Sequence, residues 1–466
     1  MEQDLSRLIP FAICAVGGLM MLIVGVFTKA AWLRRFTAFT VIFVTFVAVL
    51  LQAAVPAMER ATFYGVLFID SWSYIFQALL LVVAALVILF SRADYYLADH
   101  EGEYFTLLIF ATLGAMILVS AAEFVTLFIG LEMLSLSLYA LCGGRLLDKR
   151  SIEGALKYFL LGSFSSAILL YGLALLYGLT GTMEFVKVSE LLQDESITWI
   201  AFSLVMSGLF FKLSLVPFQF WTADTYQGAP TPITAFMATA VKIAAIGVVM
   251  RVLWVLFNGM PLEAGAWIGI VAAATLIFGN LVALRQSDVK RMLAYSGISH
   301  AGYLALALLT PEKVGSSAIV FYVVAYSLAT LGAFAVVQQV EKHSGTSEIK
   351  AFNALAKCSP LSAATMTIFM LSLAGLPPAL GGLLGKFFIF NGVISAGFVN
   401  LAVLGIVCAV ISCGYYLRVV VAMYFRETDD LQRAPCKMPF SISAIVLLLA
   451  LSIVLIGVVP DLLLFS

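Results

Sequence analysis

The sequence predicts an all-α membrane protein with about fourteen transmembrane helices, two inverted five-helix repeats and two broken helices. Hydrophobic residues make up 63% of the 466 residues and charged residues only 11%. Soluble domains contain roughly 45–50% apolar and about 25% charged residues. The mean hydropathy is +1.08, and apolar runs of about twenty residues recur, each long enough to cross a bilayer as a helix. This composition excludes a soluble enzyme and a disordered chain.

Fourteen apolar runs account for the helices, and the loops between them are short, so no soluble domain is inserted. The twelfth run is interrupted in its middle. In chain order we expect spans over Leu8–Phe27, Phe36–Ala57, Trp72–Phe90, Tyr104–Ser120, Phe124–Gly143, Leu156–Gly178, Trp199–Leu215, Thr231–Leu253, Ala264–Leu284, Met292–Leu309, Gly315–Val337, Pro360–Ala396, Leu401–Tyr424 and Ser441–Val459.

We group these spans into four parts. Residues 1–103 hold helices 1–3, and residues 104–255 hold the first repeat, helices 4–8. Residues 264–425 hold the second, inverted repeat, helices 9–13, and residues 440–466 hold helix 14.

The loop charges alternate between the two sides of the predicted topology. One side carries about three times as many lysines and arginines as the other. Loops rich in these residues face the cytoplasm, so both termini are predicted on the outer side. The richer set is Lys29, Arg34, Arg35, Arg92, Arg145, Lys149, Arg150, Arg285, Lys290, Arg291, Lys342, Lys350, Lys357, Arg426, Arg433 and Lys437, and the poorer set is Arg7, Arg60, Lys187, Arg251 and Lys313.

Two stretches align as a repeat. Gly114–Leu141 aligns without gaps with Gly279–Leu306, and Glu123 meets Asp288. Identity is low, so chance similarity is the alternative. The topology places Glu123 outside and Asp288 inside, which is the inversion that an offset of five spans requires. Each acid also begins its span, where a negative charge stabilises a helix N-terminus. Inverted repeats are common in transporters, whose ion sites lie at broken helices near the midplane.

Two proline-containing segments predict broken helices. Pro217 lacks an N–H and clashes with the carbonyl four residues back, so it frees the carbonyl of Leu213 beside Lys212. The second break is Ala374–Pro378, which is followed by Lys386. Irregular backbone at this depth is tolerated only inside protein or against water. A kinked helix end is the simpler alternative, but a membrane lysine accompanies each break.

Six charged residues remain at membrane depth: Lys157, Lys212, Lys242, Lys386, Arg418 and Glu132. A charge at the bilayer centre costs roughly 2.5–3.5 kcal/mol on insertion scales. Glu132 and Lys242 lie near the middle of their spans, too deep to reach the interface. An inert interhelical ion pair would need one cation for one acid, yet three mid-span lysines are present. Buried ionisable groups that exchange protons are what a proton relay needs.

Other chemistries lack their sequence signals. The net charge is +0, so no basic field is available for nucleic acid. The six cysteines form no CxxC pair and the three histidines are scattered, which argues against iron–sulfur and zinc sites. No strand–GxGxxG–helix unit indicates a dinucleotide site.

Four segments carry a family resemblance: LFIGLEMLSLSLYAL (127–141), GLFFKLSLVPFQFWTADTYQGAPTPITAFMATAVKIA (208–244), SDVKRMLAYSGISHAGYL (287–304) and LSLAGLPPALGGLLGKFFIF (371–390). In these segments, which span most of the core, the chain resembles the three antiporter-like membrane subunits of bacterial proton-translocating NADH-quinone oxidoreductase, respiratory complex I. The YQGAPTP and ATAVKIA forms favour one of the three.

The resemblance implies a role for each buried charge. Glu132 of the LE motif would pair with Lys212 of FKLSLVPF, and Lys242 of ATAVKIA would be the central relay. Lys386 of GKFF would lie near the exit, and His300 of SGISHAGY would link two half-channels. Opening of the Glu132–Lys212 pair would send a proton from Lys212 through Lys242 toward Lys386.

The resemblance also implies partners. Flavin, iron–sulfur clusters and quinone would lie in partner subunits, and this chain would hold no cofactor. Its neighbours would be other membrane-arm subunits, both antiporter-like and small, together with lipids, in a bacterial inner membrane. The chain departs from the family at Gln219, where a titratable histidine is usual, and at Thr222-Ala223-Asp224, where the family has TPD.

Other functions stay open. The nearest is a subunit of a multisubunit cation/proton antiporter or of a membrane-bound hydrogenase, which share the fold and much of the lysine pattern. A passive structural subunit and a self-sufficient transporter are further alternatives.

Overall fold

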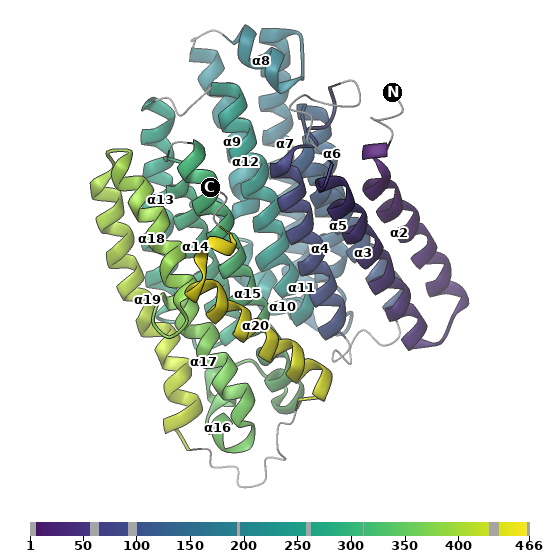
Figure 1. The fold of residues 1–466 in the computed structure, drawn as a ribbon, viewed down its shortest axis with the longest axis vertical. Coiled ribbons are helices and arrows are strands. Elements are labelled where there is room, and N and C mark those ends of the chain that lie inside the picture. The colour runs from purple at the N-terminus through teal and green to yellow at the C-terminus, as the bar shows by residue number, and fades with distance from the viewer. Residues whose placement is uncertain are drawn as a thin grey trace. The chain divides into compact units, whose positions relative to one another are not determined.

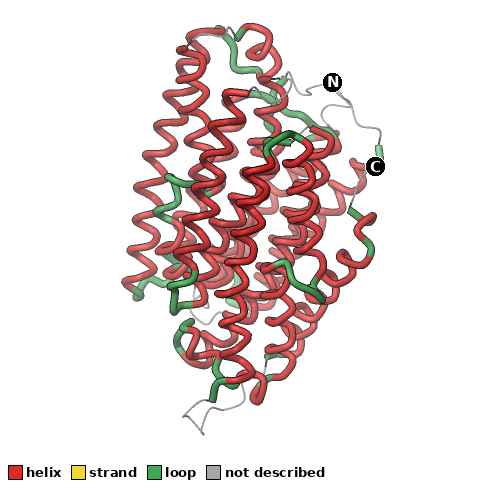
Figure 2. The backbone as a smooth tube through the Cα atoms, turned by 90° about the vertical axis from the view of Figure 1, so that its left-hand side faces the viewer, coloured by secondary structure: helices red, strands yellow, loops and turns green. Residues whose placement is uncertain are grey.

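The computed structural model describes residues 6–55, 65–91, 100–192, 196–257, 262–310, 312–427 and 438–463. This part of the chain is almost entirely helical and contains no β-strand, only three isolated bridges (Figure 2). The all-α prediction is confirmed. The predicted loop cations that lie outside the described residues are Arg60, Arg92, Arg433 and Lys437.

The chain divides into two compact units. Unit 1 comprises residues 1–89, 95–214 and 228–259, and unit 2 comprises residues 90–94, 215–227 and 260–466. The helices of unit 1 are α2 (Ile9–Phe27), α3 (Ala31–Ala53), α4 (Ser71–Ser91), α5 (Glu101–Ser120), α6 (Phe124–Cys142), α7 (Lys149–Thr180), α8 (Phe185–Leu191), α9 (Ser196–Leu213), α11 (Thr231–Phe236), η2 (Met237–Val241) and α12 (Lys242–Phe257) (Figure 1).

Unit 2 contains the remaining helices. They are α10 (Thr222–Gly228), α13 (Leu262–Ala283), α14 (Val289–Ala307), α15 (Glu312–Ser344), η3 (Ile349–Phe352), α16 (Leu355–Cys358), α17 (Pro360–Ala374), α18 (Leu380–Ser395), α19 (Val399–Phe425), α20 (Phe440–Val458) and η4 (Pro460–Leu462).

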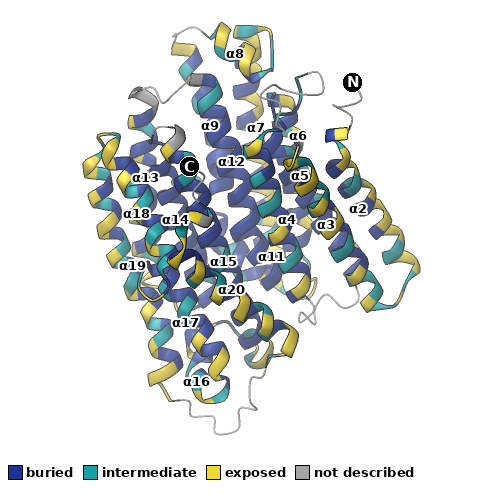
Figure 3. Ribbon diagram, viewed as in Figure 1, coloured by how far each residue is buried: buried dark blue, intermediate teal, exposed yellow. Residues whose placement is uncertain are grey.

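Twelve helices of the described residues are long and apolar enough to span a membrane. The segment Thr231–Leu256 in unit 1 and the segment Val314–Ser344 in unit 2 are almost wholly buried, whereas no more than a third of the residues of α2 and of α3 are buried (Figure 3). A helix that is apolar all round belongs in a protein interior. The segment that contains α12 and the helix α15 therefore form the cores of their respective units.

Both predicted breaks are confirmed. In the first, α9 ends at Leu213 and the backbone stays irregular until α10 begins at Thr222. In the second, α17 ends at Ala374 and α18 begins at Leu380. Gly375 closes α17 with φ +83°, a left-handed conformation that strongly favours glycine.

Two helices extend well past the predicted spans. α7 has 32 residues and α15 has 33, because each continues beyond its apolar run. Asp148 begins α7 by accepting a hydrogen bond from the N–H of Arg150, and Gly181 ends it at φ +68°. In α7, these two caps stabilise the polar end turns that lie beyond the apolar run.

One corner occurs in both units. In unit 1 the segment Thr180–Glu184 follows α7 and pairs with Glu123, and in unit 2 the segment Ser344–Glu348 follows α15 and pairs with Asp288. The hydroxyl of Thr180 accepts a hydrogen bond from the N–H of Thr182 at 3.4 Å and donates to the carbonyl of Leu176. The hydroxyl of Ser344 does the same with the N–H of Thr346, at 3.4 Å, and the carbonyl of Val340. These two segments, TGTME (180–184) and SGTSE (344–348), are similar in sequence but lie outside the alignment of residues 114–141 with residues 279–306.

Glycines allow close helix contacts at two positions that the sequence alignment pairs, one in each unit. A Cβ on Gly114 would lie 2.5 Å from the backbone N of Leu134, between α5 and α6. A Cβ on Gly279 would lie 2.7 Å from the backbone N of Ser299, between α13 and α14. Small residues let transmembrane backbones approach in this way.

An ion pair ties the loop before α4 to α12. Arg251 donates to the two carboxylate oxygens of Asp70 at 2.8 and 2.9 Å and to the carbonyl of Val119 at 3.2 Å. Burial of Asp70 opposes its ionisation, but Arg251 and the N–H of Ser73 outweigh burial and lower the pKa of Asp70 from 3.8 to about 2. The ionised carboxylate therefore stabilises the folded chain.

Replacing Asp70 with asparagine should lower the free energy of unfolding by about 1–2 kcal/mol at neutral pH, allowing for partial exposure of the carboxylate. A lowered pKa contributes stability above the unfolded pKa of 3.8, which is lost as the pH falls through about 2. Melting temperatures of wild type and Asp70→Asn in detergent should thus converge between about pH 4 and pH 2. Equal melting temperatures at neutral pH would contradict this, and Glu153→Gln, in an exposed pair, is the control.

Candidate functional site

Lys212 lies in the last turn of α9, directly before the first break. Its side chain is 3% exposed, and its Nζ has no hydrogen-bond partner among the described residues. The amine lies over three aromatic rings, with 5.4 Å to the centroid of Tyr139, 5.1 Å to Tyr158 and 5.3 Å to Phe211. Such rings attract a desolvated cation. These three rings form an aromatic cage around the amine.

Glu132 lies on α6 and accepts a hydrogen bond from the hydroxyl of Ser166 on α7. It is only partly buried. The ion pairs of the described residues, with a limit of 4.0 Å, do not include Glu132 and Lys212. Tyr139, two turns after Glu132 on the same helix, contacts the amine instead. Glu132 and Lys212 are therefore more than 4.0 Å apart in this structure, and Tyr139 lies over the amine.

Lys242 begins α12 directly after the π-helical turn η2. Its side chain is 2% exposed. The hydroxyl of Thr239, within the turn, donates to the carbonyl of Ala235 at 2.7 Å. π-turns often mark functional positions in helices because they displace the normal hydrogen-bond ladder. The sequence did not predict this turn, whose composition is that of an ordinary apolar helix.

Lys386 reaches back from α18 to the second break. Its Nζ donates to the carbonyls of Leu373 at 2.9 Å and Ala374 at 2.8 Å, the last residues of α17. The amine also lies 5.3 Å from the ring centroid of Tyr303. A cation at a helix C-terminus satisfies free carbonyls and the helix dipole together. A Cβ on Gly375 would lie 3.3 Å from Cδ of Lys386, so a glycine at the break leaves room for the lysine side chain.

His300 lies on α14 and is 4% exposed. Its Nδ1 lies 2.6 Å from the hydroxyl of Tyr322 on α15, and its Nε2 lies 3.0 Å from the hydroxyl of Tyr416 on α19. The hydroxyl of Tyr416 also bonds to Ser296. The imidazole therefore joins three helices through groups that can both give and accept protons.

The sequence analysis missed both tyrosines. Tyr322 and Tyr416 lie 22 and 116 residues from His300 in the sequence, so no local motif connects them to it. The sequence could have indicated them only through their positions along their helices, because each tyrosine falls on a buried helix face. Tyr303 links His300 to Lys386, because its ring centroid lies 6.0 Å from that of the imidazole and 5.3 Å from the amine.

Each unit therefore has its own group of candidate residues. Unit 1 contains Glu132, Lys212 and Lys242, and unit 2 contains His300 and Lys386. All but Glu132 are nearly inaccessible to solvent.

The segment after the first break is anchored within unit 2. Arg291, at the start of α14, donates to Asp224 at 2.6 Å and to Gln227 at 3.1 Å, both on α10. Asp224 belongs to the tripeptide that departs from the family pattern. Gln219, the other departure, is 4% exposed, and its Oε1 has no partner among the described residues.

Two of the six deep charges lie apart from these groups. Lys157 on α7 pairs with Glu153 at 2.7 Å and is 42% exposed, so it sits on the surface of this chain. Arg418 on α19 donates to the carbonyls of Leu284 and Gln286 and anchors the end of α13. Both have structural contacts.

The chemistry available is proton exchange. The candidate residues are amines, an imidazole, phenols, hydroxyls and one carboxylate, held in apolar helices near irregular backbone. Among the described residues, no group of three or more His, Cys, Asp or Glu side chains is placed to hold a metal ion.

Known proteins share this architecture. Residues 121–412 match the family described as NADH:quinone oxidoreductase/Mrp antiporter, TM. A protein of Trichlorobacter lovleyi named NADH-quinone oxidoreductase subunit N is 37% identical over 439 residues, covering 92% of this chain and 89% of that protein. A chain of respiratory complex I from Thermus thermophilus, solved with bound aureothin, has a TM-score of 0.84 and 34% identity, with 98% of each chain covered. A chain of the membrane-bound sulfane sulfur reductase, an archaeal respiratory membrane complex, has a TM-score of 0.89 and 26% identity, covering 98% of this chain and 95% of that one.

Proposed function

Because the chain belongs to the NADH:quinone oxidoreductase/Mrp antiporter transmembrane family, we propose that it is the antiporter-like subunit N of a bacterial proton-translocating NADH-quinone oxidoreductase. Its relatives carry that name at 37% identity over nearly their whole length. The chain is thus one subunit of an enzyme. Electron transfer from NADH to quinone takes place in partner subunits that hold flavin, iron–sulfur clusters and quinone, and this chain translocates protons.

The proton route runs through Glu132, Lys212, Lys242, His300 and Lys386. The observation that carries this proposal is the burial of three lysine amines, at 3%, 2% and 4% exposure, each beside a helix break or a π-turn. Apolar helices do not retain buried amines without a use, because each costs several kcal/mol to place there. Approach of Glu132 to Lys212 would raise the proton affinity of the amine, and separation of the two would lower it.

The route uses a fourteen-span topology with two inverted repeats. The twelve long helices, together with α14 and the α17–α18 pair, give fourteen crossings. The repeats occupy residues 104–255 and 264–425, and the matching corners at Glu123 and Asp288 support them. An even number of crossings with the basic loops inside places both termini on the outer side of the inner membrane.

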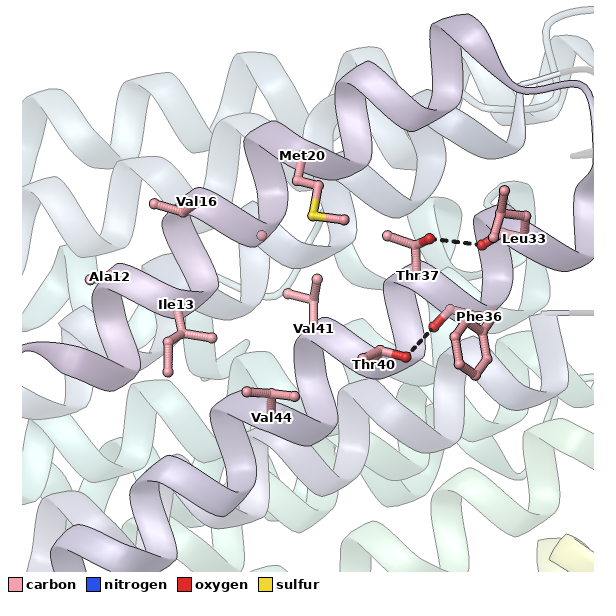
Figure 4. A pocket seen from close by; sticks show the side chains of 11 residues that line it. Ala12, Ile13, Val16, Met20, Leu33, Phe36, Thr37, Thr40, Val41 and Val44 are labelled. Atoms are coloured by element: carbon pink, nitrogen blue, oxygen red, sulfur yellow. Dashed lines mark hydrogen bonds between the residues drawn. The ribbon is translucent and has the colours of Figure 1, made fainter.

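Other membrane-arm subunits and lipids are the partners. The exposed α2–α3 face contains an apolar groove of about 670 Å³, into which Met20 and Val41 project from opposite helices (Figure 4). Such a surface suits acyl chains or an apolar neighbouring helix.

The runner-up is a subunit of a multisubunit cation/proton antiporter or of a membrane-bound hydrogenase. The matched family also includes Mrp antiporters, which supports keeping this alternative. Identity to the NADH-quinone oxidoreductase relatives is higher, which favours the first proposal.

Replacing Lys212 with alanine tests the proposal against a passive structural role. In the purified parent complex, reconstituted into liposomes, NADH-driven proton pumping should fall at least ten-fold, because the amine inside the aromatic cage is lost. Pumping is read from acidification of the vesicle interior, and assembly from the subunit composition. Unchanged pumping by a fully assembled Lys212→Ala complex would leave this chain as a scaffold.

A further inference from the structure

A second buried charge pair lies at one end of unit 2. Lys290, which the sequence analysis counted among loop cations, has a fully buried side chain. Its Nζ lies 3.8 Å from Glu341 on α15, whose side chain is 16% exposed. Lys290 opens α14 and Glu341 closes α15, so the pair sits at the helix ends, and only its carboxylate is within reach of water. The relay proposed above does not use it.

The same two helices carry His300. Lys290 and His300 are ten residues apart on α14, a rise of about 15 Å along the helix axis. On α15, buried polar side chains recur between Glu341 and the imidazole: Gln338, Thr330, Tyr326 and Tyr322. Tyr322 bonds to Nδ1 of His300, and the ring centroid of Tyr326 lies 4.8 Å from that of the imidazole.

Gln338 shows that this row of polar groups needs a further ligand. It lies one turn before Glu341 and is 4% exposed, yet neither its amide oxygen nor its amide nitrogen has a hydrogen-bond partner among the described residues. A buried amide without partners loses the hydrogen bonds that it makes with water in the unfolded chain, which destabilises the fold. Ordered water is the ordinary partner of such groups in protein interiors.

We propose that Lys290 and Glu341 form a proton-loading pair which, through water at Gln338, supplies His300 in unit 2. This inference rests on the proposed translocation function and adds an entrance that does not pass through Lys242. The Glu341 carboxylate takes a proton from water at its exposed edge and releases a proton to the water at Gln338. From there the proton passes along further waters at the buried polar groups between Gln338 and Tyr322, which include Thr330. The phenol of Tyr322 gives its proton to Nδ1 of His300 and receives one from the last of these waters. Lys290 holds Glu341 ionised between transfers.

An inert lock between α14 and α15 is the competing explanation, and the two differ in one respect. A lock requires only that neither charge is left buried alone, so replacing both residues with neutral ones of similar size restores it. A loading pair requires a group that titrates, so the double neutral variant stays defective.

The test uses the complete complex in liposomes with NADH as the electron donor. The variants are Glu341→Gln, Lys290→Met, the double variant and Gln338→Leu. Proton pumping, the protons moved per electron and the melting temperature are measured for each. Glu427→Gln is the matched control, since Glu427 forms an exposed pair with Lys357 at 3.6 Å in the same unit.

The expected result is a double variant that assembles and melts like wild type but pumps at least three-fold more slowly, with Gln338→Leu slowed similarly and Glu427→Gln unchanged. Recovery of wild-type pumping by the double variant would overturn the proposal in favour of a lock. A double variant that fails to assemble while Gln338→Leu pumps normally would overturn it as well. Lys212→Ala separates this inference from the proposed function: if Lys212→Ala stops pumping and the double variant pumps normally, only the loading pair is wrong.

Discussion

Replacing Lys242 with alanine should reduce NADH-driven proton pumping by the parent complex to less than a tenth of the wild-type rate. The side chain is 2% exposed and lies where the π-turn η2 meets α12, inside the most buried segment of unit 1. The other ionisable residue of α12 is Arg251, which pairs with Asp70. Coupled quinone reduction should fall with pumping, because electron transfer cannot proceed against a blocked translocation step.

Two further variants sharpen this result. Lys242→Arg keeps the positive charge but cannot release its proton at physiological pH, so it should pump no better than Lys242→Ala. Lys157→Ala removes a lysine from a membrane helix at a surface ion pair with Glu153, and it should pump normally. Normal pumping by an assembled Lys242→Ala complex would remove this residue from the route.

Replacing Lys386 with methionine should both stop pumping and destabilise the chain. The amine donates to the carbonyls of Leu373 and Ala374 at the end of α17. Its loss leaves two buried carbonyls without a donor, at a cost of about 1–3 kcal/mol each. A drop in the melting temperature of the detergent-solubilised complex should therefore accompany the loss of pumping.

Lys386→Arg separates the two roles of this residue. The guanidinium supplies donors and charge to the same carbonyls, so the melting temperature should rise above that of Lys386→Met. Pumping should stay low, because arginine retains its proton. If Lys386→Arg pumps like wild type, the residue only caps α17 and does not carry protons.

The candidate lysines could be predicted from the sequence because a lysine within an apolar run can be recognised without knowing the fold. A lysine well inside an apolar run, unlike Lys157 at the edge of its span, cannot reach the interface and is therefore expected inside the protein. Lys212, Lys242 and Lys386 were found in this way, and their exposures of 3%, 2% and 4% confirm the burial.

Contacts between distant segments could not be predicted in this way. The partners of His300 lie on α15 and α19, and neither tyrosine differs in sequence from the many that only pack. The position of Tyr139 over the Lys212 amine could not be predicted for the same reason. Lys290 was assigned to a loop because its apolar run was judged to begin at Met292, yet α14 begins at Val289 and buries it.

The sequence by itself determined that this is an all-helical membrane protein, where its apolar helices lie, and where two of them break. These are local properties: in lipid, each stretch of backbone must satisfy its own hydrogen bonds, so helices follow apolar runs and end where proline or glycine interrupts the ladder. Only the tertiary structure decided which polar groups meet. It placed Lys212 in an aromatic cage, Lys386 on the carbonyls of α17, and Lys290 beside Glu341. Such contacts depend on helix rotation and packing, which apolar side chains around each site set together and which no single segment encodes.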